Sequence, residues 1–237
     1  MISLLLPTRR RQHFVKDFVD SIISTAHDIG SLELIVRVDF DDDSTGSLIE
    51  ITERLPKTRF IVNERPVFLG DCWNDAWKAS TGDILQLCTD DLIYKTKGWD
   101  KIIHNTAADY PDGIFFICGM NGRGRKDSEK DFATHPFIGR KLTEVLGYFV
   151  PHGQKISNDS WQHFVCSRVG RKIVLNDVLI EHRDPHIEDD THKELYEDWV
   201  RDGKNYESRI LERLQDVVKV RRYLDEQKLS EGGIPMT

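Results

Sequence analysis

The sequence predicts an α/β fold: a mostly parallel central sheet with helices on both faces, followed by a C-terminal helical extension. Short apolar runs, typical of buried parallel strands, alternate with segments in which apolar residues recur at helical spacing. Several of these runs end in polar or acidic residues, and the last 47 residues are charged and helical in pattern. With 237 residues, 39% of them hydrophobic, the chain is long enough to bury a substantial core.

The expected elements follow one another in regular order. Strands are predicted at the apolar runs 2–6, 32–38, 60–62, 84–88 and 114–118. Helices are predicted at 14–23, 49–55, 70–79 and 98–107, then two more within 139–170, before one or two short strands over 172–181. This order is typical of nucleotide-binding α/β folds, but neither GxGxxG nor GxxxxGK[ST] follows the first strand.

Charge and composition exclude several classes of protein. There are 33 Lys and Arg against 40 Asp and Glu, a net charge of −7, which argues against a dedicated nucleic-acid-binding protein but leaves a nucleic acid acceptor open. No apolar run has the roughly 18–20 residues of a membrane span, and the N-terminus lacks the order of a signal peptide. The four cysteines form no CxxC pair, which favours buried thiols in a reducing, cytoplasmic setting.

Polar groups follow three of the predicted strands directly. Pro7-Thr8-Arg9 follows the first, Asp39 ends the second, and Thr89-Asp90-Asp91 follows the fourth. The carboxyl ends of parallel strands share one edge of the sheet, where ligands bind. Clustered carboxylates there are suited to a divalent cation that also contacts phosphate oxygens. For Asp41–Asp43, capping of the next helix is the preferred interpretation.

The segment from Gly70 to Asp91, GDCWNDAWKASTGDILQLCTDD, is similar to the central motif of GT-A glycosyltransferases of the family 2 type. The opening ISLLLPTR and the later LIVRVD resemble the first two strands of that family, so the resemblance covers about residues 1–182. It implies a metal-dependent, inverting glycosyltransferase that moves a sugar from a nucleotide-diphosphate donor, expected to be a UDP-sugar, to an unknown acceptor hydroxyl. A nucleotidyltransferase and a non-catalytic nucleotide- or glycan-binding module remain as alternatives.

The resemblance also implies roles for individual residues. Pro7, Thr8, Arg9, Asp39 and Asp90 would bind the nucleotide, with Asp39 at its nucleobase end. Asp91 would bind Mn²⁺ or Mg²⁺ and His182 would be a further ligand, although Thr89 stands where the family usually has aspartate. Asp159 would be the general base, with Asn158 in place of the usual first carboxylate. The alternative for Asp159 is a helix cap.

Further expectations concern a basic loop, one tryptophan and the histidines. The basic loop with Arg123 and Arg125 is either a lid over an anionic ligand or an exposed loop, and Trp161 is a candidate for stacking on the acceptor. A zinc set of His182, His186 and His192 is disfavoured by irregular spacing. Most of the remaining histidines are expected on the surface or in loops: His13, His27, His104, His135, His152 and His163.

The resemblance suggests a domain organisation as well. Residues 1–190 would form the catalytic domain, with a nucleotide-binding half at 1–118 and an acceptor-side half at 119–190. Residues 191–237 would form the helical extension, docked through an apolar stripe of Leu211, Leu214, Val217, Val218 and Leu224.

Overall fold

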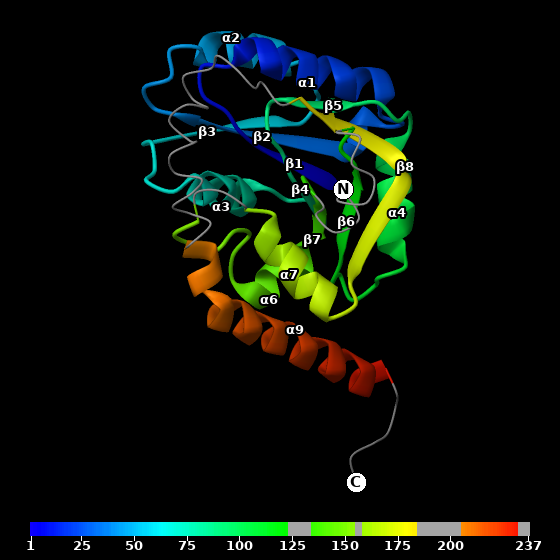
Figure 1. Ribbon diagram of the computed structural model, residues 1–237. Coiled ribbons are helices and arrows are strands. Elements are labelled where there is room, and N and C mark those ends of the chain that lie inside the picture. The colour runs from blue at the N-terminus through cyan, green and yellow to red at the C-terminus, as the bar shows by residue number, and fades with distance from the viewer. Residues whose placement is uncertain (123–133, 155–157, 184–204, 232–237) are drawn as a thin grey trace.

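The computed structural model describes residues 1–122, 134–154, 158–183 and 205–231, and these form an α/β fold around one mixed sheet (Figure 1). Within the described residues the sheet has eight strands in the order β3-β2-β1-β4-β7-β6-β8-β5. The strands are β1 (Ile2–Pro7), β2 (Leu32–Asp39), β3 (Thr58–Asn63), β4 (Ile84–Leu87), β5 (Leu92–Tyr94), β6 (Phe116–Met120), β7 (Phe137–Gly139) and β8 (Lys172–His182).

The first half of the sheet is parallel, as the sequence predicts. β1 lies between β2 and β4, so that Leu4 is opposite both Leu34 and Gln86, and β3 pairs with the outer edge of β2. Every residue of β2 and β4 is buried, which explains why these strands are predominantly apolar, with Glu33, Arg37 and Gln86 as buried polar exceptions. Their carboxyl ends therefore lie along one edge.

Helices cover both faces of the sheet, which confirms the predicted layers. On one face, α1 (Gln12–Thr25), α2 (Thr45–Thr52) and α4 (Trp99–Ala108) pack with β1 and β2 into one hydrophobic core. On the other face, α3 (Leu69–Ala79), α6 (Arg140–Leu146), α7 (Ser160–Arg168) and α9 (Ile210–Glu231) form a second core. Figure 1 shows α9 running across the outside of α6 and α7.

The second half of the sheet contains three antiparallel pairs. β7 pairs antiparallel with both β4 and β6, and β5 pairs antiparallel with β8. The sequence predicted neither β5 nor β7, each of three residues, and β8 is one strand of 11 residues. Because Leu92 is opposite His182 in the β5–β8 pair, the ladder brings His182 beside Asp91.

α9 docks through a different face from the one expected. Val217, Val220 and Leu224 are buried in the second core. Leu211, Leu214 and Val218 are exposed, at 71%, 41% and 64%. The expected stripe is therefore wrong for these three positions, and α9 packs against the second core through the others.

Two expectations from composition can be compared with the structure. Cys72, Cys88, Cys118 and Cys166 are all free and buried, as predicted. In the described part of the chain, no helix has both the length and the apolar character needed to cross a bilayer.

Candidate functional site

The ends of β1 and β4 meet at Asp90, whose carboxylate is held on both oxygens. The hydroxyl of Thr8 donates to Asp90 Oδ2 over 2.7 Å, and Arg11 Nη1 lies 2.8 Å from Asp90 Oδ1. Asp90 is 3% exposed and Arg11 is 9% exposed, so this ion pair is built into the edge of the sheet. The sequence pattern points to Thr8 and Asp90 but not to Arg11, because the motif PTRRR does not distinguish Arg11 from its neighbours.

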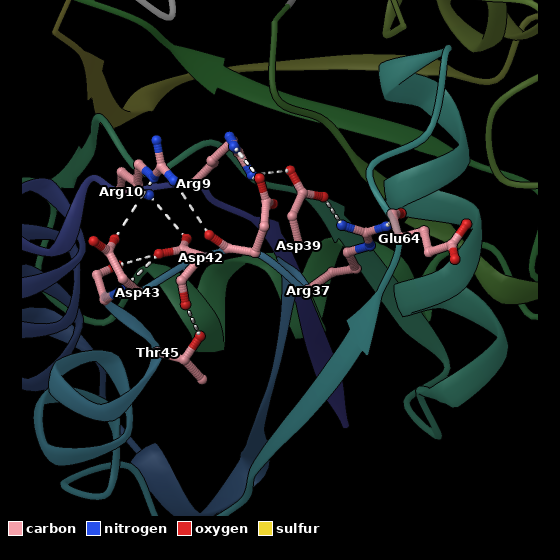
Figure 2. Close-up of polar contacts among 10 residues, drawn as sticks. Arg9, Arg10, Arg37, Asp39, Asp42, Asp43, Thr45 and Glu64 are labelled. Atoms are coloured by element: carbon pink, nitrogen blue, oxygen red, sulfur yellow. Dashed lines mark hydrogen bonds and ion pairs between the residues drawn. The ribbon is translucent and has the colours of Figure 1, made fainter.

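At the end of β2, Asp39 lies between two arginines (Figure 2). Arg9 Nη1 is 3.0 Å from Asp39 Oδ2, and Arg37 pairs with the other oxygen. Arg37 is itself 2% exposed and donates to the Glu64 carbonyl over 2.5 Å. Arg9 also forms a two-pronged pair with Asp41, and this hydrogen bonding lowers the pKa of Asp41 to about 2. Arg37 is a further member of the site, and no sequence motif marks it.

The neighbouring Asp42 has a structural role. Its carboxylate accepts hydrogen bonds from the Ser44 N–H at 2.9 Å, the Ser44 hydroxyl at 2.6 Å and the Arg10 N–H at 2.9 Å. These bonds fix the turn before α2 and join it to the loop after β1 (Figure 2). Asp42 thus stabilises the turn that leads into α2 rather than capping the helix, whose N-cap is Ser44 without a side-chain capping bond.

Asp91 and His182 form a pair suited to a divalent cation. Asp91 Oδ2 lies 3.4 Å from His182 Nε2, while Asp91 Oδ1 accepts a 2.5 Å hydrogen bond from the Thr89 hydroxyl. Burial opposes ionisation of Asp91, but the bonds from His182 and Thr89 outweigh it and hold the pKa of Asp91 well below its usual range.

The Asp91–His182 spacing is compatible with adjacent positions around a metal with bonds of about 2.1 Å. No larger cluster of potential metal ligands, of three or more, occurs among the residues that the structure describes. A cation bound by one carboxylate and one imidazole would complete its shell with phosphate oxygens and water, which is the usual arrangement for substrate-bound Mg²⁺. The residues present therefore fit a nucleotide-bound divalent ion.

His135 lies at this site, in the loop before β7, and it is buried rather than on the surface. His135 is only 8% exposed, and its Nε2 lies 3.1 Å from the Thr89 hydroxyl oxygen. The His135 and His182 rings are 4.4 Å apart, edge to face. Its backbone has φ of 54°, a left-handed conformation uncommon outside glycine. No local sequence pattern marks this position, because its neighbours come from β4 and β8.

Asp159 stands immediately before α7 and is partly buried. Loss of hydration raises the pKa of its carboxyl group to about 6, although the His182 charge and the N–H groups of Asp159, Ser160 and His135 act in the opposite direction. Asp159 makes no side-chain capping bond to α7. A carboxylate with a pKa near 6 is matched to proton transfer at neutral pH.

The other expected acceptor-side residues have different locations. Trp161 is 1% exposed, donates from Nε1 to Asp216 Oδ2 over 2.9 Å, and has the Arg209 guanidinium 4.7 Å from its ring centre. A ring packed in this way offers no surface for stacking, so that expectation does not hold in this structure. Asn158 is 6% exposed and packs against Gly70 of α3. Arg123, Arg125, His186 and His192 lie outside the described residues.

Comparison with solved structures identifies the fold. The mannosyltransferase PcManGT from Pyrobaculum calidifontis, in complex with GDP-Man and Mn²⁺, has a TM-score of 0.65 at 16% identity, over 99% of this chain and 76% of that one. S. aureus TarS 1-349 with UDP-GlcNAc has a TM-score of 0.64 at 16% identity, over 78% of this chain and 59% of that one. This chain thus spans about three fifths of the TarS fragment.

A third similar structure is glucosyl-3-phosphoglycerate synthase from Mycobacterium tuberculosis, in complex with Mn²⁺, UDP and glucosyl-3-phosphoglycerate. It has a TM-score of 0.55 at 17% identity, over 78% of this chain and 72% of that chain. These likenesses show that the fold is GT-A. No curated protein sequence is significantly similar to the chain. The sequence does match the family described as Glycosyl transferase family 2 over residues 3–169, well over half of its length. The chain therefore belongs to glycosyl transferase family 2.

Proposed function

We propose that this protein is a metal-dependent, inverting glycosyltransferase that moves a sugar from a nucleotide-diphosphate donor, preferentially a UDP-sugar, to an acceptor hydroxyl. Family membership and the GT-A fold support the reaction class. The observation that carries the proposal is the grouping around His135. His135 contacts Thr89 and so adjoins the Asp91–His182 pair. The backbone N–H of His135 also donates a hydrogen bond to the Asp159 carboxylate, whose pKa is raised.

In this proposal the ends of β1 and β2 bind the donor nucleotide. Asp39 is fixed by Arg9 and Arg37 and presents a carboxylate as an acceptor for a nucleobase N–H group. Thr8 and Arg11 hold Asp90 and so shape the backbone turn against which the nucleotide lies. A divalent ion held by Asp91 and His182 would supply charge neutralisation for the departing diphosphate.

Asp159 carries the proton chemistry. Its carboxylate accepts the proton of the acceptor hydroxyl while that oxygen forms a bond to the anomeric carbon from the face opposite the diphosphate. The bond from the anomeric carbon to the diphosphate oxygen breaks, and the configuration is inverted. Partial burial keeps Asp159 basic enough for this step near neutral pH.

The similar structures support the donor class and the metal. PcManGT is bound to GDP-Man and Mn²⁺, and TarS is bound to UDP-GlcNAc. The test is to incubate the protein with a panel of UDP- and GDP-sugars, with Mn²⁺, Mg²⁺ or EDTA, and to measure release of the free nucleoside diphosphate. Metal-dependent release from a UDP-sugar is expected, and proton NMR of the glycoside would then report inversion.

The two alternatives give different results in the same assay. Tight nucleotide-sugar binding without any release would point to a binding module, and release of pyrophosphate from a nucleoside triphosphate would point to a nucleotidyltransferase. Either outcome would contradict the proposal. As for compartment, four buried free thiols are suited to a reducing environment, and we propose the cytoplasm.

A further inference from the structure

Thr89 occupies the first position of the Thr-Asp-Asp segment after β4, and its hydroxyl has two polar neighbours. It donates to Asp91 Oδ1 at 2.5 Å, and it lies 3.1 Å from His135 Nε2. The other oxygen of the same carboxylate, Asp91 Oδ2, faces His182 Nε2 at 3.4 Å and lies 4.0 Å from Arg11 Nη2. The two oxygens of Asp91 therefore have separate partners: Thr89 at Oδ1, and His182 of β8 together with Arg11 at Oδ2.

The number of protons on these groups determines the direction of the hydrogen bonds. A threonine hydroxyl has a single proton, and an ionised carboxylate can only accept. The Thr89 proton is therefore used by Asp91, so the Thr89 oxygen acts as acceptor toward His135. This requires a proton on His135 Nε2, and the chain of donors runs from His135 to Thr89 to Asp91.

The backbone at His135 supports a role beyond a simple turn. Its φ of 54° places a side chain in a conformation that glycine or asparagine adopts at less cost. Strained residues of this kind persist where surrounding contacts determine them, and they cluster at functional sites. Here the contacts are the Thr89 hydroxyl and the His182 ring, whose centre is 4.4 Å from that of His135.

We propose that Thr89 and His135 are positioning residues that orient Asp91 toward a divalent ion shared with His182. They take the place of the first carboxylate that the family usually has in this segment: a neutral hydroxyl, fixed by an imidazole N–H, holds Asp91 Oδ1 and leaves Oδ2 for the ion. The inference rests on the metal-dependent part of the proposed function. Hydrogen-bond partners behind a metal ligand typically change metal affinity by about 10–100-fold when removed.

The test measures Mn²⁺ binding without turnover. The full chain is titrated with Mn²⁺, with and without UDP, and free Mn²⁺ is followed by electron paramagnetic resonance. Thr89→Val removes the hydroxyl at nearly constant shape, and Thr89→Ser restores it. His135→Asn keeps a residue that tolerates positive φ but is too short to reach Thr89. Matched controls are Thr106→Val, whose hydroxyl bonds only within α4, and the exposed His27→Gln.

Thr89→Val and His135→Asn should each weaken Mn²⁺ binding about 10–100-fold. The double variant should be no weaker than the worse single variant, because the two residues act in series. Thr89→Ser and both controls should bind Mn²⁺ like the unmodified protein. Unchanged affinity in Thr89→Val, or full additivity in the double variant, would overturn the inference.

A metal-free measurement separates this inference from the proposed function. Nitrogen-15 NMR of the histidine rings should show His135 in the Nε2–H form, and Thr89→Val should shift it toward the Nδ1–H form. If the unmodified protein binds no Mn²⁺ even with UDP, the metal-dependent function is wrong and with it the metal-orienting role. If Mn²⁺ binds but His135 carries its proton on Nδ1, the proposed function stands, and the hydrogen-bond chain from His135 through Thr89 to Asp91 is refuted.

Discussion

Replacement of Asp159 by asparagine should slow sugar transfer and, at neutral pH, make the free protein more stable. Asparagine keeps the size of the side chain but cannot accept the proton of the acceptor hydroxyl. A positioned general base contributes about 10²–10⁴-fold, so kcat should fall by that factor while the KM for the donor changes little. The stability effect arises because burial makes the Asp159 carboxylate costly to ionise in the folded state.

The size of the stability effect follows from the pKa. Burial raises the pKa of Asp159 from 3.8 to about 6. At about 1.4 kcal/mol per pKa unit, this corresponds to at most about 3 kcal/mol. Between pH 4 and 6 the folded protein binds more protons at Asp159 than the unfolded chain does, so this group lowers stability as the pH rises. The asparagine side chain does not ionise, so the variant does not lose stability at this position as the pH rises.

The assay is urea denaturation of the metal-free and ligand-free proteins at several pH values. The difference in unfolding free energy between the Asp159→Asn variant and the unmodified protein should be small near pH 3.5 and reach up to about 3 kcal/mol in favour of the variant by pH 7.5. Asp177→Asn, at an exposed carboxylate on β8, is the matched control and should show no such trend. A variant with near-normal kcat and no pH-dependent gain would refute both the burial argument and the assignment of the base.

Three further substitutions address the nucleotide and metal groups. Asp91→Asn should abolish Mn²⁺-dependent UDP binding in calorimetry but retain metal-free binding; an unchanged Mn²⁺ effect would contradict the ligand assignment. Asp39→Ala should weaken UDP binding in the absence of metal, whereas Asp42→Ala should leave UDP binding unchanged. Asp42→Ala should instead lower the unfolding free energy by about 1–3 kcal/mol, because the Ser44 N–H loses its acceptor. Equal losses of UDP affinity in the two variants would indicate a general charge effect. Arg37→Met should destabilise the fold by about 3–5 kcal/mol in urea denaturation, since Asp39 keeps a buried charge without that partner; a stability loss below 1 kcal/mol would contradict this.

The parallel half of the sheet was predictable because its signals are local. β1, β2 and β4 are buried on both faces, so each is a predominantly apolar segment, and polar residues lie at or just beyond its carboxyl end. The position of Asp39 and Asp91 directly after these runs was enough to predict a shared edge. The contacts of Asp39 with Arg9, of Asp90 with Thr8 and of Asp91 with Arg11 follow from the order of strands rather than from any one segment.

The antiparallel half of the sheet was harder to predict from the sequence, because its short strands are determined by the strands with which they pair. β5 and β7 have three residues each, too few for a periodic pattern, and they form strands by pairing with β8, β4 and β6. His135, two residues before β7, comes to the site through that pairing and a positive φ. Trp161 illustrates the opposite problem: an aromatic residue beside Asp159 suggested a ligand platform, but packing against α9 buries it.

The docking of α9 has a consequence for how the C-terminal region can be altered. Asp216 of α9 accepts hydrogen bonds from the Trp161 indole and from the Tyr148 hydroxyl, and Trp161 is only two residues from Asp159. α9 therefore supports the segment that carries the proposed base, and it cannot be exchanged freely. A chimera that exchanges this helix between relatives would have to keep the contacts of Asp216 with Trp161 and Tyr148. Removing α9 would expose the side of α7 that packs against it.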